Sequence, residues 1–231
     1  MRPSPMPEPE LVVFDLGGTT IHDRGEVPAA FAEALRAGGI AFEAAELDAW
    51  RGASKRDVVA KLLGRGGPGA AASRVDDVYR IFRRGLTARL TCAGELSLPG
   101  IARMIGRLRA ARIRVAIATG FDREIVALVL GSVEWGGMLD AQVCSDDVRE
   151  GRPAPYLIFE AMERCGVRDV RRVAVVGDTR LDLEAGWNAG ATYRIGVLTG
   201  AHDRATLLAA PHTHVLQSAA DVPDLWLETA T

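Results

Sequence analysis

Cysteine is scarce in this chain of 231 residues, and neither acidic nor basic residues are in strong excess. The three cysteines, Cys92, Cys144 and Cys165, are odd in number and form no CxxC pair, so we expect reduced thiols used in packing rather than a disulfide framework. The formal net charge of -2 gives no reason to expect a nucleic-acid or membrane partner.

Long apolar segments are also missing. No apolar run reaches the ~18 residues that cross a bilayer. The first ten residues, MRPSPMPEPE, lack the apolar core of a secretory signal. Together with the reduced thiols, these absences lead us to expect a cytoplasmic protein.

What the chain does contain is an alternation of strand and helix patterns. Three short segments are apolar at nearly every position: LVVFD (Leu11–Asp15), RVAIAT (Arg114–Thr119) and RVAVVGD (Arg172–Asp178). Strands that are buried on both faces have this composition, as in a parallel sheet covered by helices. Helical periodicity in residues 101–113 and 154–167 lies between them. We therefore predict a doubly wound, mostly parallel α/β sheet of the Rossmann-like type.

A long helical segment separates the first two of these strands. They lie about a hundred residues apart, whereas one strand–helix unit needs far fewer. Residues 27–91 have mostly helical patterns, interrupted by a glycine-rich loop at Gly64–Ala72.

The C-terminal stretch predicts a further strand, a loop, a helix and a closing strand at THVLQS.

The helical segment predicts two domains. We expect a helical cap domain over residues 24–93, inserted into an α/β core domain made of residues 1–23 and 94–231. The linkers between the two are expected near Asp23–Val27 and Cys92–Pro99.

Polar residues follow the apolar strands at the points where these strands end. Asp15, Thr119 and Asp178 each stand at such a carboxyl end, where ligands bind in open α/β sheets, and Asp182 follows Asp178 by one helical turn. Three carboxylates in one crevice repel each other unless a cation lies among them, and Mg²⁺ favours oxygen ligands. The pattern suggests a metal-assisted site for a phosphate-like group. Taken singly, each Asp also fits an N-cap or a solvated position.

Four ordered motifs extend this interpretation. Gly17 and Gly18 would let the backbone turn sharply after Asp15 and bring its N–H groups near an anion. Four segments follow one another over nearly the whole chain: DLGGT at Asp15–Thr19, Thr119 after an apolar strand, Arg152 in GRPAP, and GDTRLD at Gly177–Asp182. In this order they resemble the motifs of the haloacid dehalogenase superfamily. The helical insertion directly after the first motif resembles the helical cap of that superfamily.

The resemblance implies a role in phosphoryl transfer for each of these residues. Asp15 would attack phosphorus and form an aspartyl-phosphate, Thr119 would bind phosphoryl oxygens, and Arg152 would neutralise the transferring group. The implied Mg²⁺ ligands are Asp15, the Gly17 carbonyl and Asp178, with Asp182 acting through a metal-bound water. The implied phosphate and substrate contacts are Gly18, Thr19 and Gly120, joined by Gly52 and Arg51 from the insertion.

Gly17 departs from the pattern of most phosphatases in the superfamily. They carry a second aspartate at this position, which protonates the departing ester oxygen, and such general acid help is worth roughly 10²–10⁴-fold. The branch without that acid is the phosphonatase-like one, named for phosphonoacetaldehyde hydrolase, whose leaving group is carbon. The segment Gly17–Thr20 and the arginine at Arg152, where most relatives have lysine, resemble this branch.

Lys55 is the candidate for the imine-forming lysine of that branch. Gly52, Lys55 and Asp57 fit its Gly-x-x-Lys-x-Asp pattern, in which a cap lysine forms a Schiff base with the substrate aldehyde. Such a lysine needs a lowered pKa, to which Arg51 and Arg56 are close enough in sequence to contribute. Two alternatives stay open: Lys55 as a charged contact to substrate phosphate, and Lys55 as a surface residue in the first turn of a helix.

Two positions depart from the branch as well. Val58 stands where the branch has a histidine, and Arg51 stands where it has a methionine. His22 is a candidate replacement for the missing histidine, although a linker histidine is the favoured interpretation. An added cation at Arg51 would suit a larger or more anionic 2-oxo-phosphonate.

Three functions therefore remain open. The leading one is a Mg²⁺-dependent hydrolase that cleaves the C–P bond of phosphonoacetaldehyde or a related 2-oxo-phosphonate, through an aspartyl-phosphate and a Lys55 Schiff base. The alternative is a phosphatase for a small phosphate ester or acyl phosphate, with Lys55 only a phosphate contact. An idle binding protein is disfavoured because the charged motif residues are all retained. The resemblance further implies a homodimer.

Overall fold

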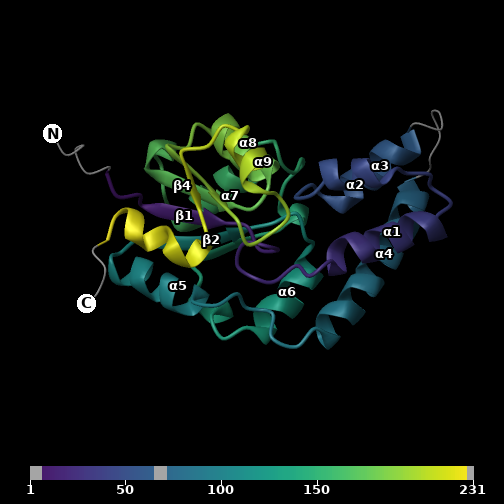
Figure 1. Cartoon of the computed structure of the whole chain (residues 1–231), viewed down its shortest axis with the longest axis horizontal. Coiled ribbons are helices and arrows are strands. Elements are labelled where there is room, and N and C mark those ends of the chain that lie inside the picture. Colours follow the sequence, from purple (N-terminus) through teal and green to yellow (C-terminus); the bar gives the residue numbers. More distant parts are fainter. Residues whose placement is uncertain (1–6, 65–71, 228–231) are drawn as a thin grey trace.

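A six-stranded parallel sheet forms the centre of the molecule (Figure 1). The computed structural model describes residues 7–64 and 72–227. The strands run in the spatial order β3-β2-β1-β4-β5-β6, which is a doubly wound arrangement and confirms the predicted fold class. The strands are β1 (Leu11–Phe14), β2 (Arg114–Ala118), β3 (Ala141–Val143), β4 (Val173–Gly177), β5 (Tyr193–Val197) and β6 (His214–Leu216).

The two faces of the sheet are covered by different helices. Along β1 the side chains alternate, so that Val12 and Phe14 join the hydrophobic cluster on one face while Leu11 and Val13 join the cluster on the other. Helices α5 and α6 cover the first face, and α7 and α8 cover the second (Figure 1). These helices and α9 have the bounds α5 (Ile101–Ala110), α6 (Arg123–Ser132), α7 (Tyr156–Cys165), α8 (Arg180–Ala189) and α9 (Arg204–Leu208).

The register of the central strands brings their carboxyl ends to one edge. Phe14, the last residue of β1, pairs with Ile117 of β2 and with Val176 of β4. The residues that follow these three strands therefore leave the sheet at nearly the same level. In a sheet of this order, the strand order reverses between β1 and β4, and ligands bind beside that point.

The segment between β1 and α5 is helical, as the sequence predicts. We call residues 24–93 the helical insertion, which lies to one side of the sheet (Figure 1). The rings of Phe31 in α1 and Phe82 in α4 meet edge to face at 5.6 Å, within one hydrophobic cluster. The predicted loop at Gly64–Ala72 falls mostly outside the described residues. The helices of the insertion are α1 (Glu26–Ala37), α2 (Ala44–Ala49), α3 (Lys55–Gly64) and α4 (Ala72–Cys92).

The chain enters and leaves the insertion through two segments that run side by side. Ile21 and Ser97 form an antiparallel bridge, and the Leu98 N–H donates to the Thr20 carbonyl at 3.0 Å. The guanidinium of Arg24 reaches the Ala93 carbonyl at 3.1 Å. The two connections are thus adjacent, as expected for a unit that is attached to the sheet at one place.

The C-terminal part differs in detail from the sequence prediction. The predicted strand, helix and closing strand are present as β5, α9 and β6, but β6 covers only His214–Leu216 of the THVLQS segment. A 3-10 helix at Ala219–Leu225 follows and packs beside α5 on the sheet. Other 3-10 helices span Gly136–Met138, Ser145–Asp147 and Val170–Arg172.

In the described part of the chain, no helix is both long and apolar enough to cross a membrane.

Candidate active site

A cleft lies between the carboxyl edge of the sheet and the helical insertion. It encloses about 650 Å³ of space that is partly open to solvent. The sheet side contributes the residues that follow β1, β2 and β4, and the insertion side contributes α1, α2 and the turn before α3. Of the predicted site residues, the cleft lining contains Asp15, Gly17, Arg51, Gly52, Lys55, Thr119, Gly120, Arg152 and Asp178.

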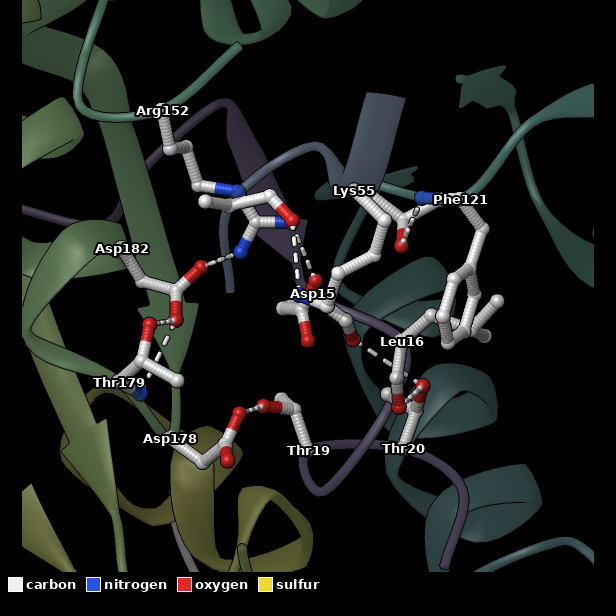
Figure 2. A network of polar contacts seen from close by, with 12 residues as sticks. Asp15, Leu16, Thr19, Thr20, Lys55, Phe121, Arg152, Asp178, Thr179 and Asp182 are labelled. Carbon is white, nitrogen blue, oxygen red and sulfur yellow. Dashed lines mark hydrogen bonds and ion pairs between the residues drawn. The ribbon is translucent and has the colours of Figure 1, made fainter. Parts of the chain in front are cut away.

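Arg152 joins two of the predicted carboxylates. Its Nη2 donates to Asp15 Oδ1 at 2.6 Å, and its Nη1 donates to Asp182 Oδ1 (Figure 2). All three side chains are buried, with 5%, 8% and 3% of their area exposed. A guanidinium in this place offsets the negative charge of the two buried carboxylates.

Asp178 is enclosed at the end of β4. Its carboxylate accepts hydrogen bonds from Thr19 Oγ1 at 3.1 Å and from the Ala201 N–H at 2.6 Å. A Cβ atom at Gly18 would approach Asp178 Oδ2 to 2.5 Å, and one at Gly200 to 2.0 Å, so the carboxylate needs glycine at both positions. Burial, followed by the charge of Asp15, raises the pKa of Asp178 to about 7.

Asp182 is held by the start of α8. The sequence Thr179-x-x-Asp182 forms a capping box, in which Asp182 Oδ2 accepts from the Thr179 N–H at 3.0 Å and from Thr179 Oγ1 at 2.5 Å. This arrangement buries Asp182, so the alternative of a water-facing helix position is wrong. Gly52 of the insertion, with φ +80°, lies against Thr179. A Cβ atom at Gly52 would be 2.6 Å from Thr179 Oγ1.

Thr119 and Gly120 follow β2 and line the cleft. Thr119 is buried, and its Oγ1 accepts from the Phe121 N–H at 3.3 Å. A Cβ atom at Gly120 would be 3.2 Å from the Gly52 carbonyl oxygen and 3.3 Å from the Ala53 carbonyl oxygen. The predicted phosphate-binding turn therefore touches the turn that leads to Lys55.

Lys55 is the first residue of α3, and its side chain enters the cleft. The ammonium donates to the Ala53 carbonyl at 3.0 Å and to the Trp50 carbonyl at 3.1 Å, and it lies 5.6 Å from the centre of the Phe31 ring. Burial of the ammonium, followed by the charge of Arg152, lowers the pKa of Lys55 to about 8. Lys55 is half-buried and lines the cleft, so the alternative of a surface lysine is wrong.

The neighbours that tune Lys55 differ from those expected from sequence. Arg51 does lower the pKa of Lys55, but Arg152 has the larger effect, and Arg56 instead pairs with Asp76 on α4. Arg51 lines the cleft and pairs with the exposed Asp48 at 3.1 Å. The sequence could not reveal the effect of Arg152, because it lies almost a hundred residues from Lys55 along the chain.

Gly17 has room for a side chain. A Cβ atom there would make an ordinary contact of 3.5 Å with the ring of Phe121, and the backbone of Gly17 does not have a positive φ. Crowding thus does not account for the absence of an acid at this position. His22, the candidate replacement for a proton shuttle, is not among the described residues that line the cleft.

Two features of the cleft were not predicted. The first is the loop after β5, where the Ala201 N–H donates to Asp178. The rule that ligands bind beyond the carboxyl ends of strands also points to this loop, which follows a fourth strand end. Asp23, in the first connection to the insertion, also lines the cleft. No motif pointed to Asp23, because its relation to Lys55 depends on how the insertion packs.

The oxygen donors fit a magnesium ion. Among the described residues, no three His, Cys, Asp or Glu side chains already form a metal cage. Mg²⁺ does not require one, because it is usually held by one or two carboxylates, water and substrate oxygens. Asp15 and Asp178 lie close enough for their charges to interact, and a cation between them would favour the ionised form that burial disfavours.

Comparison with known proteins shows a clear similarity. A family model described as haloacid dehalogenase-like hydrolase matches residues 9–190. The phosphonoacetaldehyde hydrolase of Paraburkholderia phytofirmans is 31% identical over 202 residues, which cover 81% of this chain and 74% of that protein.

Two solved structures share the fold. A hydrolase from Pseudomonas syringae superposes with a TM-score of 0.81 and 22% identity, covering 93% of this chain and 96% of the other. A phosphonoacetaldehyde hydrolase-like protein from Oleispira antarctica superposes with a TM-score of 0.80 and 24% identity, covering 95% and 91%. At these identities the two structures support the arrangement of the elements alone.

Proposed function

Because this chain belongs to the haloacid dehalogenase-like hydrolases, we propose that it cleaves the C–P bond of phosphonoacetaldehyde or a related 2-oxo-phosphonate. The observation that carries this proposal is the presence of Lys55 and Asp15 in one cleft, with Lys55 at a pKa of about 8. A lysine of this kind is partly a free amine at neutral pH and can attack an aldehyde. Gly17 supplies no acid for an ester oxygen, which is consistent with a carbon leaving group.

The first half of the reaction joins the two residues through the substrate. The Lys55 amine condenses with the aldehyde carbon, water leaves, and a protonated imine remains. A carboxylate oxygen of Asp15 then attacks phosphorus and the C–P bond breaks. The bonding electron pair moves into the imine, which becomes an enamine on Lys55, and the phosphoryl group stays on Asp15 as an acyl phosphate.

The second half returns both residues to their starting state. The enamine gains a proton at carbon, and water hydrolyses the resulting imine to release acetaldehyde and the free Lys55 amine. A second water hydrolyses the aspartyl-phosphate to inorganic phosphate. The Arg152 guanidinium, paired with Asp15 and Asp182, would neutralise charge on the phosphoryl group.

Magnesium would be held by Asp15, Asp178 and the Gly17 carbonyl, with Asp182 acting through water. When bound, it would supply charge neutralisation at the phosphoryl oxygens and orient them for in-line attack. Thr119, Gly120, Gly18 and Thr19 would contact the phosphoryl group. Arg51 and Gly52 would contact the rest of the substrate from the insertion side of the cleft.

We also propose that residues 24–93 act as a cap over a core of residues 1–23 and 94–231. The cleft is shared by both parts, and Gly52 and Gly120 meet across it. Closure of such a unit would exclude water from the imine, and opening would release products.

The test is a comparison of substrates and variants. The purified protein with Mg²⁺ is supplied with phosphonoacetaldehyde or with small phosphate esters, and inorganic phosphate and acetaldehyde are measured. Asp15→Asn should abolish release from every substrate. Lys55→Arg should abolish release from phosphonoacetaldehyde because arginine forms no imine, whereas a phosphate contact would survive.

The phosphatase alternative predicts a different pattern. Phosphate would be released from esters or acyl phosphates by the parent protein, and Lys55→Arg would keep a large part of that activity. This result, together with no turnover of phosphonoacetaldehyde, would contradict C–P cleavage and assign Lys55 to phosphate binding.

A further inference from the structure

We propose that Asp23 is a further catalytic residue of this site, the general acid–base that moves protons during imine formation at Lys55. This inference rests on the proposed imine chemistry and adds a residue for which the motifs give no role. Asp23 lies in the first connection to the helical insertion and lines the same cleft as Lys55 and Asp15. Its Oδ1 accepts from the Gly25 N–H at 3.1 Å, which fixes the carboxylate at the insertion side.

The other carboxylates of the cleft are already engaged in the phosphoryl site. Asp15 pairs with Arg152, and Asp178 is bonded by Thr19 and by the Ala201 N–H. Among the described cleft residues, Asp23 is the carboxylate that lies outside this network. Imine chemistry needs a proton carrier close to the amine. Val58, which stands in place of the branch's histidine, cannot carry a proton, and His22 does not line the cleft.

The contacts of Lys55 leave one proton available for transfer. A lysine ammonium has three N–H groups, and in the described part of the chain two of them are accounted for by the carbonyls of Trp50 and Ala53. When the third proton leaves, both carbonyls can keep their hydrogen bonds, and the nitrogen lone pair takes the direction of the lost proton. The two carbonyls thus orient the amine for attack.

Asp23 lines the same cleft as Lys55, and its charge acts on the ammonium. Its charge raises the pKa of Lys55, opposing the effects of burial, Arg152 and Arg51, while Asp15 raises it as well. No direct ion pair joins the two side chains, so the aldehyde oxygen of the substrate or one water would bridge them. This bridged position is where the carbinolamine oxygen would form.

The proton balance of the step is closed. The Asp23 carboxylate takes the third proton from the Lys55 ammonium, and the free amine forms a C–N bond to the aldehyde carbon. One proton passes from that nitrogen to the former carbonyl oxygen. Asp23 then returns its proton to the same oxygen, which leaves as water as the C–O bond breaks. The protonated imine remains, and Asp23 is again a carboxylate.

Charge and catalysis by Asp23 have opposite consequences, which makes the proposal testable. Removing the charge in Asp23→Asn lowers the pKa of Lys55 further, so more free amine is present near neutral pH. If Asp23 acted only through its charge, imine formation in this variant would be as fast or faster. If Asp23 carries protons, imine formation becomes slower even though more amine is available.

The experiment measures how fast the imine forms. The protein is mixed with phosphonoacetaldehyde and Mg²⁺, quenched with borohydride at timed intervals, and the two-carbon adduct on Lys55 is quantified by mass spectrometry. Asparagine keeps an oxygen for the Gly25 N–H, so the connection should retain its shape. The matched control is Glu26→Gln, which removes a carboxylate that bonds Arg24 in the same connection but does not line the cleft.

Three outcomes decide the matter. We expect trapping in Asp23→Asn to be at least about 10²-fold slower than in the parent, with Glu26→Gln unchanged and Asp23→Glu recovering part of the rate. Trapping in Asp23→Asn that is as fast as in the parent would overturn the role of Asp23 and leave the proposed function standing. Absence of an adduct in the parent protein would overturn the imine chemistry itself, and the role of Asp23 with it.

Discussion

At the scale of single residues, the proposed chemistry depends on two positions. Lys55 is a partly buried ammonium beside the guanidinium of Arg152, and both effects favour its neutral amine. Gly17 provides no proton for a leaving oxygen, although the backbone and the Phe121 ring leave room for a side chain. Under the proposed function, Lys55 would form the imine that serves as electron sink for C–P cleavage, and Gly17 leaves the site without the acid that an ester oxygen requires.

The pH dependence of turnover should report the state of Lys55. Because the pKa of Lys55 is lowered from 10.5 to about 8, the free amine forms at lower pH than in an ordinary lysine. At pH 7 about one molecule in ten would carry the amine, against fewer than about one in a thousand without the shift. We expect kcat/KM for phosphonoacetaldehyde to rise about tenfold per pH unit up to about pH 8 and then level off.

A neighbouring charge provides the control for this profile. Arg51 lowers the pKa of Lys55, so Arg51→Gln should move the inflection toward higher pH. A profile that levels off only above about pH 10 would mean that Lys55 has an ordinary pKa. That result would remove the main support for an imine.

Restoring the missing acid should create a phosphatase activity. Gly17→Asp places a carboxyl group two residues after Asp15, where it can protonate an alkoxide, and the site has space for it. We expect hydrolysis of a simple ester such as ethyl phosphate to increase by about 10²-fold or more. Gly17→Asn is the matched control of equal size, and equal rates for the Asp and Asn variants would contradict the explanation.

At the scale of secondary structure, the strand ends were predictable and the contacts of the insertion were not. Asp15, Thr119 and Asp178 meet at one edge because parallel strands in register end together, and this follows from three apolar segments. The Thr179-x-x-Asp182 spacing also shows a capping box in the sequence itself. In contrast, Arg152 lies on a loop before α7, and only its resemblance to a family motif placed it in the site.

Helix α6 and its link to the insertion illustrate what short-range patterns miss. Asp122 caps α6 by accepting from the Ile125 N–H at 2.9 Å, and its other oxygen accepts from the buried Tyr79 hydroxyl of α4 at 2.9 Å. The two residues are 43 positions apart. Their pairing depends on the whole path of the insertion, so no local motif marks it.

This hydrogen bond should stabilise the protein. Tyr79→Phe keeps the ring that packs against Phe82 but leaves a buried carboxylate oxygen without its donor. We expect the free energy of unfolding, measured by urea denaturation, to fall by about 1–3 kcal/mol. Tyr156→Phe, on the half-buried start of α7, should change it by less than about 0.5 kcal/mol. Equal unfolding midpoints for the two variants would show that the α4–α6 bond contributes little.

At the scale of the whole molecule, the cleft exists because two parts of the chain face each other. The two connections between them run side by side, through the Ile21–Ser97 bridge and the contact of Arg24 with Ala93. If the insertion acts as the proposed cap, we expect it to move as a unit about these two connections. The sequence predicted that an insertion exists, but its orientation over Asp15 required the structure.

A reversible cross-link can test whether the insertion must open. A Cβ atom at Gly151 would lie 3.4 Å from Ser54 Cβ, close to the separation found in disulfides. Gly151 belongs to the loop before α7, and Ser54 belongs to the helical insertion. We expect the variant with Ser54→Cys and Gly151→Cys to lose turnover when oxidised and to regain it on reduction. The two single variants, treated in the same way, are the controls. Full turnover by the oxidised double variant would show that opening is not needed.

The central claim is that Lys55 forms an imine with a 2-oxo-phosphonate in the same cleft as Asp15. The most direct measurement is intact-protein and peptide mass spectrometry after borohydride reduction of the protein with Mg²⁺ and phosphonoacetaldehyde. We predict one two-carbon adduct per chain, on Lys55, and none in Lys55→Arg. A protein that releases phosphate from esters yet carries no adduct on Lys55 would contradict the claim and identify the chain as a phosphatase.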